Sequence, residues 1–246
     1  NEPFVNNLNF KTNFLTFGCD KYKKTSERIK LECENINIFD NILLRNVDYL
    51  KEKSEFWNKH EHFIINNERG FGYWIWKPFL IYDTLLQMNS NDILVYCDSG
   101  CEINQKGKNI LQGYFEIVSN SPYGILSFQM SHRREYEWTK MDIFKKMAIE
   151  IDSSTFNSGQ LIGTIIIIKK CEHSLKVFKE ILEISENYNL INDSQSNLKN
   201  HPDFIENRHD QSISSIIRKK HGTEIIEDET VYINDDTIPI YAKRIR

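Results

Sequence analysis

Residues 91–104 read NDILVYCDSGCEIN and place a buried run directly before an acidic turn. Ile93–Cys97 is short, apolar and aromatic, which is typical of a covered strand. Asp98 follows at once, and Ser99-Gly100 turns the chain. In open α/β sheets, ligands bind beyond the carboxyl ends of the strands. Asp98 is therefore predicted to lie at a binding edge, although Asp-Ser-Gly is also ordinary turn chemistry.

On both sides of this stretch, strand patterns alternate with helix patterns. The expected strands are 14–18, 38–44, 93–97, 124–128 and 161–168, followed by short ones at 223–226 and 230–233. The expected helices are 26–35, 54–66, 78–88, 108–118, 172–187 and 210–220. This alternation predicts an α/β fold with a mixed, mostly parallel sheet covered by helices on both faces. The polar segment 191–208 is predicted to be an irregular, mobile loop.

Composition sets further bounds on the class of protein. The 246 residues, 40% of them hydrophobic, suit one large domain, and we assign 1–246 to it. The net charge of −4 does not suggest bulk electrostatic attraction to nucleic acid, which usually needs a basic face. The five cysteines form no dense framework and follow no secretory signal, and the run 161–168 is too short to cross a bilayer. We expect a cytoplasmic protein, free or peripheral at a membrane. Because it begins with Asn, we expect a processed chain or a piece of a longer one.

Asp98 suits two kinds of ligand. A carboxylate at a strand end can hold a hard divalent cation or accept a hydrogen bond from a ribose hydroxyl. Gly100 would let a bulky ligand approach the backbone. Glu102 is either a second, water-mediated metal ligand or a solvated loop acid. The cysteines on either side of Asp98 lack a second Cys/His pair at zinc spacing, so we interpret them as small buried side chains.

Several segments, taken in order, resemble a known family. They are NFLTFG (13–18), RGFGYWIWKPFLI (69–81), DILVYCDSGCEIN (92–104), WTK (138–140), FNSGQLIGTIIIIKK (156–170) and RHDQS (208–212). Together they resemble GT-A-fold glycosyltransferases of large DNA viruses and bacteria, including the first domain of a multidomain chlorella-virus glycosyltransferase. The resemblance implies a single GT-A-like, Rossmann-like domain. It also implies transfer of a hexosyl or deoxyhexosyl group from a nucleotide-sugar, usually with Mn²⁺ or Mg²⁺.

The family's Asp-x-Asp element, which holds metal and ribose, corresponds here to Asp98-Ser99-Gly100. The third position is Gly, so the second carboxylate is missing. The resemblance therefore leaves three possibilities open: Glu102 or a later group substitutes, the metal is held loosely, or none is used. We assign Asp98, Glu102 and His209 as the candidate metal ligands.

The stretch RGFGYWIWKP offers cations and aromatic rings close together. Arg69 and Lys77 are predicted to face a diphosphate. Trp76 is either a pocket wall or core. The glycines permit tight backbone geometry, but their spacing does not complete a phosphate-binding P-loop.

The first strand ends in Thr16, Phe17 and Gly18, which the resemblance places against the nucleotide. A simple strand end explains these residues equally well. Arg28, in the following helix, is a candidate contact to the base or diphosphate, or a surface cation.

Later residues supply the candidates for the sugar. Asp210 is predicted to be a catalytic or sugar-binding carboxylate, although Asp before a helix is often only an N-cap. His209 is a candidate metal or phosphate partner, and Gln211 a ligand of sugar hydroxyls. The list is completed by the predicted sugar contacts Gly159 and Gln160 and the reserve general base Glu137.

The sequence thus predicts metal-assisted transfer from a nucleotide-sugar, with a UDP-sugar as the expected donor and a glycan or protein-linked sugar as acceptor. Neutralising the leaving diphosphate is the main electrostatic task of such a reaction. Two other functions stay open: a non-catalytic nucleotide- or carbohydrate-binding domain of a larger enzyme, and a nucleotidyltransferase.

Overall fold

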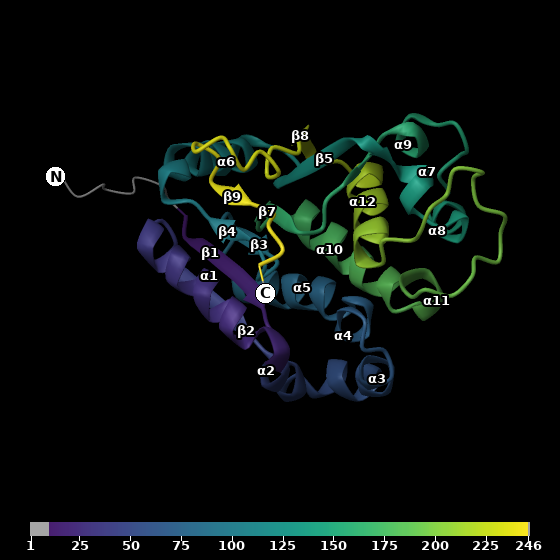
Figure 1. Ribbon diagram of the computed structural model, residues 1–246, viewed down its shortest axis with the longest axis horizontal. Coiled ribbons are helices and arrows are strands. Elements are labelled where there is room, and N and C mark those ends of the chain that lie inside the picture. Colours follow the sequence, from purple (N-terminus) through teal and green to yellow (C-terminus); the bar gives the residue numbers. More distant parts are fainter. Residues whose placement is uncertain (1–9, 246) are drawn as a thin grey trace.

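A computed structural model describes residues 10–245 and contains one seven-stranded mixed sheet (Figure 1). The strand order is β2-β1-β3-β7-β5-β6, with β8 also paired to β5. The strands are β1 (Thr12–Phe17), β2 (Asn41–Arg45), β3 (Ile93–Cys97), β5 (Ile125–Arg134), β6 (Gly159–Leu161), β7 (Ile165–Lys169) and β8 (Glu224–Glu227). From the pairings, β2, β1, β3, β5 and β8 run one way, and β7 and β6 run the other. The expected mixed, mostly parallel α/β sheet is confirmed.

Helices occupy most of the remaining chain. The longer ones are α1 (Lys23–Ile36), α3 (Ser54–Ile65), α5 (Trp76–Gln87), α6 (Lys108–Asn120), α10 (Glu172–Ser185) and α12 (Asp210–His221). The short ones are α2 (Val47–Glu52), α4 (Gly70–Tyr73), α7 (Glu135–Trp138), α8 (Met141–Lys146), α9 (Ser154–Asn157) and α11 (Tyr188–Ile191), with 3-10 turns η1 (Asp20–Tyr22) and η2 (Gln105–Gly107). A small second sheet pairs β4 (Glu102–Ile103) with β9 (Ile240–Tyr241).

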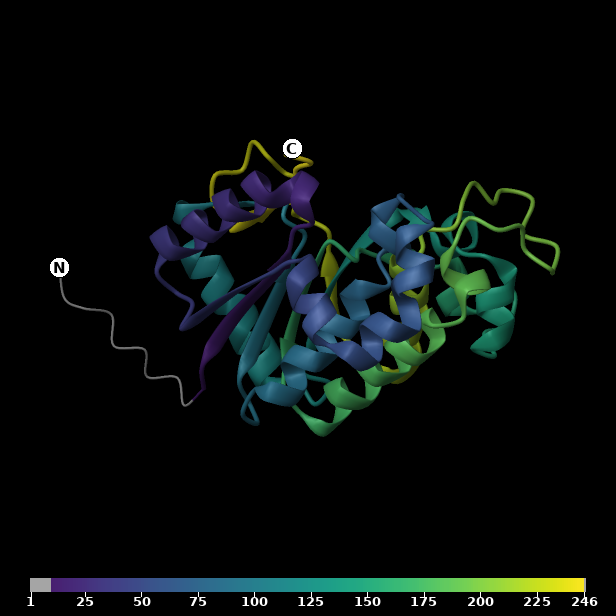
Figure 2. The ribbon, with the colours of Figure 1, turned by 90° about the horizontal axis from the view of Figure 1, so that it is seen from below.

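The central strands are apolar throughout because both of their faces are covered. Side chains alternate across a strand, so Leu94 and Tyr96 of β3 enter one core while Val95 and Cys97 enter the other. The first core includes α3, α5, α10 and α12, and the second includes α1 and α6. Figure 2 shows α1 (purple) and α10 (green) on opposite sides of the strands.

Two strand predictions were wrong. The run 161–168 is not one strand, because β6 pairs with β5 and ends at Leu161, whereas β7 begins at Ile165 and pairs with β3. Between them, the Gly163 amide donates to the side chain of Gln211 instead of a neighbouring strand. Residues 230–233 form turns with exposed apolar side chains, and no strand partner holds them. The hydrophobicity of these two segments does not by itself predict the break between β6 and β7 or the turns at 230–233.

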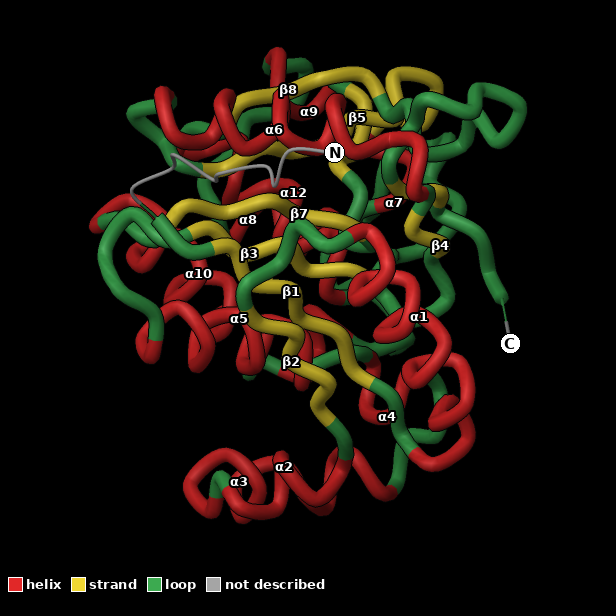
Figure 3. The backbone as a smooth tube through the Cα atoms, turned by 90° about the vertical axis from the view of Figure 1, so that its left-hand side faces the viewer, coloured by secondary structure: helices red, strands yellow, loops and turns green. Residues whose placement is uncertain are grey.

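The second half of the chain extends beyond the sheet. α7, α8, α9 and α11 gather at one end of the molecule, with the irregular segment 192–208 beside them (Figure 1). At the edge formed by β2, α2 and α3 lie outside the stacked strands (Figure 3). No helix within residues 10–245 combines the length and the apolar composition that crossing a bilayer requires.

Candidate active site

Three charged side chains meet at the carboxyl end of β3. The Lys77 ammonium lies 3.1 Å from Asp98 Oδ1 and 3.2 Å from Asp210 Oδ2. It also donates to the Gly163 carbonyl at 3.1 Å. The side chains of Lys77 and Asp210 are only 6% and 7% exposed, whereas that of Asp98 is 33% exposed. The cluster therefore reaches solvent through Asp98.

The fold explains why these residues meet. Asp98 directly follows β3, and its amide donates to Thr164 O, just before the antiparallel strand β7. Lys77 is the second residue of α5, and Asp210 is the first residue of α12. The partial positive charge of a helix N-terminus stabilises Asp210. The same partial charge at the N-terminus of α5 repels the Lys77 ammonium, so the carboxylates of Asp98 and Asp210 are needed to stabilise that cation.

Burial and charge shift the proton equilibria of the cluster. The pKa of Asp210 is raised to about 6, mainly by burial; Lys77 opposes this shift, and Asp98 adds to it. Burial alone would lower the pKa of Lys77, but Asp210 and Asp98 outweigh that effect and raise it. At neutral pH, Asp210 is therefore an ionised carboxylate close to its titration point, which is a property found at functional sites.

Tyr96 also belongs to this site, and the sequence reading missed it. Its hydroxyl donates to Asp98 Oδ1 at 2.6 Å. Tyr96 and Asp98 are two residues apart, so their side chains leave the strand on the same side. The two-residue spacing from Asp98 could have indicated Tyr96 as a site residue, but an aromatic residue within an apolar strand is usually interpreted as part of the core.

A left-handed turn precedes Lys77. Five consecutive residues, 70–74, have φ between 51° and 83°. The glycines at 70 and 72 accept this conformation easily, but Phe71, Tyr73 and Trp74 each cost about 1–2 kcal/mol. Such strain persists only where the surrounding structure enforces it, and it is common beside functional sites. The predicted tight geometry of the two glycines is confirmed.

His209 ties this turn to α12. It also has a positive φ, 56°, and its ring stacks on Tyr73, with centroids 5.3 Å apart, and lies tilted against Trp74 at 5.1 Å. His209 Nε2 lies 2.8 Å from Asp193 Oδ1, and Arg69 donates to the other oxygen of Asp193 at 2.9 Å. Burial lowers the pKa of His209, although Asp193 opposes this effect. His209 and Arg69 thus position the starts of α12 and α5. Asp193, which links these two side chains, is not among the residues predicted from the sequence.

Gln160 and Gln211 link the site to a buried polar network. Gln211 donates to Gln160 Oε1 at 2.7 Å and accepts from the Gly163 amide at 2.8 Å. Gln160 is fully buried and donates toward Glu135, which is itself fully buried and paired with Lys219 at 2.7 Å. Gln160 therefore supports the site from behind, instead of facing the solvent side where sugar hydroxyls were expected.

Other predicted site residues have structural roles here. Phe17 and Trp76 are buried and pack against each other, with ring centroids 4.1 Å apart. Thr16 is fully buried, and a Cβ at Gly18 would contact Ser26. A Cβ at Gly159 would lie 2.3 Å from Met130 O, so this glycine allows close strand approach.

The remaining candidates lie around the turn after Asp98 and on α7. Arg28 donates to Ser99 O at 2.9 Å and to Cys101 O at 2.7 Å, and it pairs with Glu32. It therefore fixes the turn and is neither a free surface cation nor an open ligand contact. Glu137 accepts from the Arg134 amide at 2.7 Å as a helix cap.

The predicted metal ligands do not form one set. Glu102 pairs with Lys243 at 2.9 Å, and His209 pairs with Asp193. Across residues 10–245, no group of three or more His, Cys, Asp or Glu side chains is arranged to hold a metal ion. A Cβ at Gly100 would lie 3.2 Å from Lys243 O and 3.4 Å from Ile245 O, so a carboxylate there would meet carbonyl oxygens. Residues 243–245 of the chain itself therefore pack against Gly100.

Four arginines lie beside this site, and we call Arg69, Arg133, Arg208 and Arg244 the arginine cluster. The guanidinium groups of Arg133 and Arg208 lie 5.0 and 4.5 Å from the ring of Trp138. Burial lowers the pKa of Arg208, Glu206 opposes this effect, and Arg133, Arg244 and Arg69 lower the pKa further.

The arginine cluster carries more positive charge than its acidic partners balance. Arg69 pairs with Asp193 and Glu206, and Arg208 pairs with Glu206, so two carboxylates face four guanidinium groups. Arg133 and Arg244 have no ion pair or hydrogen bond within the described chain. A surplus of about two positive charges beside Asp210 and the Gly100 turn suits an anionic ligand.

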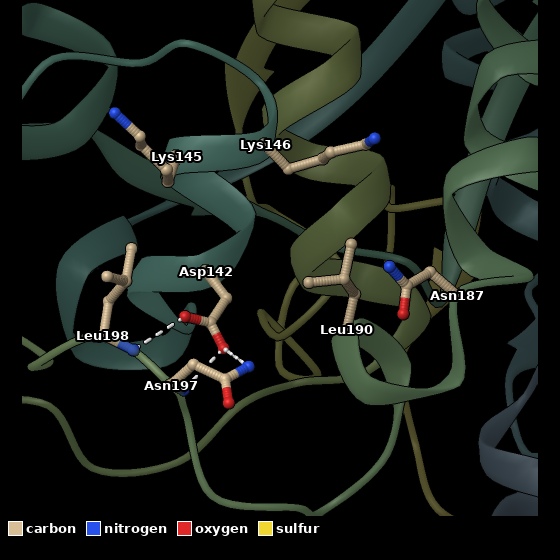
Figure 4. A pocket seen from close by; sticks show the side chains of 7 residues that line it. All are labelled: Asp142, Lys145, Lys146, Asn187, Leu190, Asn197 and Leu198. Atoms are coloured by element: carbon tan, nitrogen blue, oxygen red, sulfur yellow. Dashed lines mark hydrogen bonds between the residues drawn. The ribbon is translucent and has the colours of Figure 1, made fainter.

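An open groove of about 280 Å³ lies elsewhere, between α8, α11 and the loop that follows (Figure 4). Asp142 accepts from the Asn197 and Leu198 amides there, and Lys145 and Lys146 border the opening. None of the predicted site residues lines this groove. It is a separate surface feature.

No family model matches the sequence, and no curated protein does. Among solved structures, 34 chains match. A glycosyltransferase involved in glycosylation of the PBCV-1 major capsid is 11% identical, with a TM-score of 0.40 over 72% of this chain and 68% of that one.

Two further similar structures are also glycosyltransferases. Mouse xyloside xylosyltransferase 1, in its apo form, is 11% identical, with a TM-score of 0.46 over 94% of this chain and 83% of that one. The galactosyltransferase LgtC, in complex with donor and acceptor sugar analogs, is 10% identical, with a TM-score of 0.43 over 94% of this chain and 87% of that one.

Proposed function

We propose that this protein is a glycosyltransferase that moves a hexosyl or deoxyhexosyl group from a nucleotide-sugar, first of all a UDP-sugar, to a hydroxyl of a glycan or protein-linked sugar. The supporting observation is the meeting of Asp98, Asp210 and Lys77 at the carboxyl end of β3. Ligands of open α/β sheets bind at this edge. The ordered segments that resemble GT-A glycosyltransferases contain all three residues.

Asp98 is the proposed residue that accepts a hydrogen bond from a hydroxyl group of the nucleotide-sugar. Its Oδ1 is held by Tyr96 and Lys77, whereas no described residue hydrogen-bonds its Oδ2. With one oxygen fixed and the other open, the carboxylate is oriented before a ligand arrives. A ribose or sugar hydroxyl that donates to Oδ2 would form a charge-assisted hydrogen bond, which is stronger than one between neutral groups.

Asp210 is the proposed carboxylate that faces the donor sugar. Glycosyl transfer passes through an oxocarbenium-like state in which positive charge develops on the ring. A buried, ionised carboxylate stabilises such charge more than an exposed one, because little water screens it. The departing diphosphate carries negative charge, and the arginine cluster is the proposed counter-charge.

Titration calorimetry with UDP-, GDP-, TDP- and CMP-sugars tests this proposal, together with NMR detection of products. One donor should bind, and a nucleoside diphosphate or monophosphate should be released in step with glycoside or free sugar. If none of these donors bound at millimolar concentration, the proposal would be abandoned. Release of pyrophosphate would indicate a nucleotidyltransferase instead.

A non-catalytic binding domain is the second candidate. The observation favouring it is Gly100, whose side-chain position is filled by the chain's own C-terminal segment, so no second carboxylate completes the turn. This alternative predicts donor binding without turnover. Turnover by the wild-type chain, lost in Asp210→Asn at unchanged donor affinity, would exclude it.

A further inference from the structure

The position that a divalent cation would take between the carboxylates is filled by Lys77. Its ammonium has three N–H groups, and three oxygens surround it: Asp98 Oδ1 at 3.1 Å, Asp210 Oδ2 at 3.2 Å and Gly163 O at 3.1 Å. The ammonium is therefore held by two ion pairs and one hydrogen bond. A fixed, buried ammonium is a cation that the chain supplies itself.

A metal ion fits poorly beside this ammonium. Mg²⁺ and Mn²⁺ favour several oxygen ligands in a regular arrangement, but Asp98 is left with one free oxygen, and Gly100 adds none. Glu102 is paired with Lys243. A divalent ion on Asp98 would also be repelled by the Lys77 ammonium, which is 3.1 Å from Asp98 Oδ1 and only 6% exposed, so that solvent screens the repulsion weakly.

The chain also has positive charge for a diphosphate. Arg208 is two residues before Asp210, and the Arg244 backbone packs on Gly100, two residues after Asp98, where its Cα would lie 3.5 Å from a Cβ. Arg133 and Arg244 have no ion-pair partner among the described residues. Guanidinium groups bind phosphate oxygens through two parallel hydrogen bonds, so they can replace a metal as the counter-charge.

We propose that the protein binds its donor and supports departure of the diphosphate without a divalent metal ion: Lys77 occupies the cation position, and the arginine cluster neutralises the phosphates. This inference rests on the proposed function. It assigns Lys77 as a positioning residue that orients Asp98 and Asp210. It also assigns Arg208 and Arg244 as residues that contact the diphosphate.

Manganese binding, measured by electron paramagnetic resonance on the metal-stripped full chain without nucleotide, tests the first half. Wild type should leave the signal of free Mn²⁺ unchanged. Lys77→Ala removes the ammonium from between two carboxylates, so it should gain a Mn²⁺ site that Lys77→Ala/Asp98→Asn lacks. The control is Lys145→Ala, which changes an exposed lysine of the separate groove and should behave as wild type. A wild-type Mn²⁺ site that is lost in Asp98→Asn would overturn the inference.

Calorimetry with UDP tests the second half and does not depend on folding of the Lys77 variant. Wild-type affinity in EDTA should equal that in Mn²⁺ within about twofold, and Arg208→Gln and Arg244→Gln should each weaken it at least about tenfold in EDTA. The inference would also be overturned if UDP bound only in the presence of Mn²⁺, or if Arg208→Gln and Arg244→Gln both bound UDP with wild-type affinity. If no nucleotide-sugar or UDP bound under either condition, the proposed function would fail, while the manganese experiment would still decide the role of Lys77.

Discussion

Lys77 and Asp210 lie in the first turns of two different helices, yet Lys77 Nζ lies 3.2 Å from Asp210 Oδ2. Both residues follow strained backbone: the left-handed turn 70–74 precedes Lys77, and His209 with φ 56° precedes Asp210. The Tyr73 and Trp74 rings contact the His209 ring, so the two strained segments hold each other. The buried ion pair thus depends on contacts outside the helices that carry it.

Removing the charge of Asp98 should weaken donor binding. We expect Asp98→Asn to raise the Kd for the nucleotide-sugar about 10- to 100-fold, because hydrogen bonds to a charged acceptor contribute about 1.5–3 kcal/mol. Titration calorimetry measures this change. Asp152→Asn, at an exposed position, is the matched control and should leave Kd unchanged. Equal affinities of wild type and Asp98→Asn would remove Asp98 from the site.

Activity should decline at acidic pH with an apparent pKa near that of Asp210, about 6. Below this pH the carboxyl is neutral and no longer stabilises positive charge on the sugar. A pH profile of kcat/KM should therefore fall about tenfold per unit below pH ~6. The residual activity of Asp210→Asn should not show this acidic fall in kcat/KM. If the fall persisted in the variant, the titration would belong to another group.

The same carboxyl group affects stability in the opposite sense. Its pKa of about 6 in the folded protein exceeds the ordinary value of 3.8, so folding favours the protonated form. The stabilisation that it contributes is complete below pH ~4 and is lost as pH rises through about 6. Urea unfolding of wild type and Asp210→Asn between pH 4 and 7 should show this trend only in wild type.

Lys77→Met should destabilise the fold. It would leave Asp98 and Asp210 facing each other without the cation, and breaking a buried pair from one side costs about 3 kcal/mol or more. Urea denaturation measures the free energy of unfolding. Lys77→Met/Asp210→Asn should recover part of the loss, since the buried negative charge is also removed. A loss below about 1 kcal/mol would mean that the pair is well solvated.

The left-handed turn gives a prediction with a matched glycine control. Gly72→Ala forces a Cβ at φ +83° to within 2.7 Å of Ile64 Cγ1, so we expect a loss of about 2 kcal/mol or more. Gly113 lies inside α6, and nothing lies within 4 Å of its added Cβ. Gly113→Ala should stabilise the protein by about 0.5–1 kcal/mol. Thermal unfolding distinguishes them, and equal shifts would contradict the strained-turn interpretation.

The central strands and the three charged site residues could be predicted from residue order. Ile93–Cys97 is observed as the strand β3, and Asp98, Lys77 and Asp210, all of them predicted site residues, lie together at its carboxyl end. The strand predictions succeed because hydrophobic periodicity and turn chemistry act over a few neighbouring residues. The same local patterns also predict Phe17 and Trp76 as candidate ligand contacts, yet both side chains are buried in the hydrophobic core.

Tertiary packing decided the rest of the site. Tyr96 contributes to it because β3 ends beside β7 and places Asp98 within reach of the Tyr96 hydroxyl, and Asp193 because the irregular segment returns to His209 and Arg69. Local patterns specify which residues form strands and where acids follow them. Which cation neutralises which acid depends on distances between remote segments, and these are set by burial of two cores on opposite faces of one sheet.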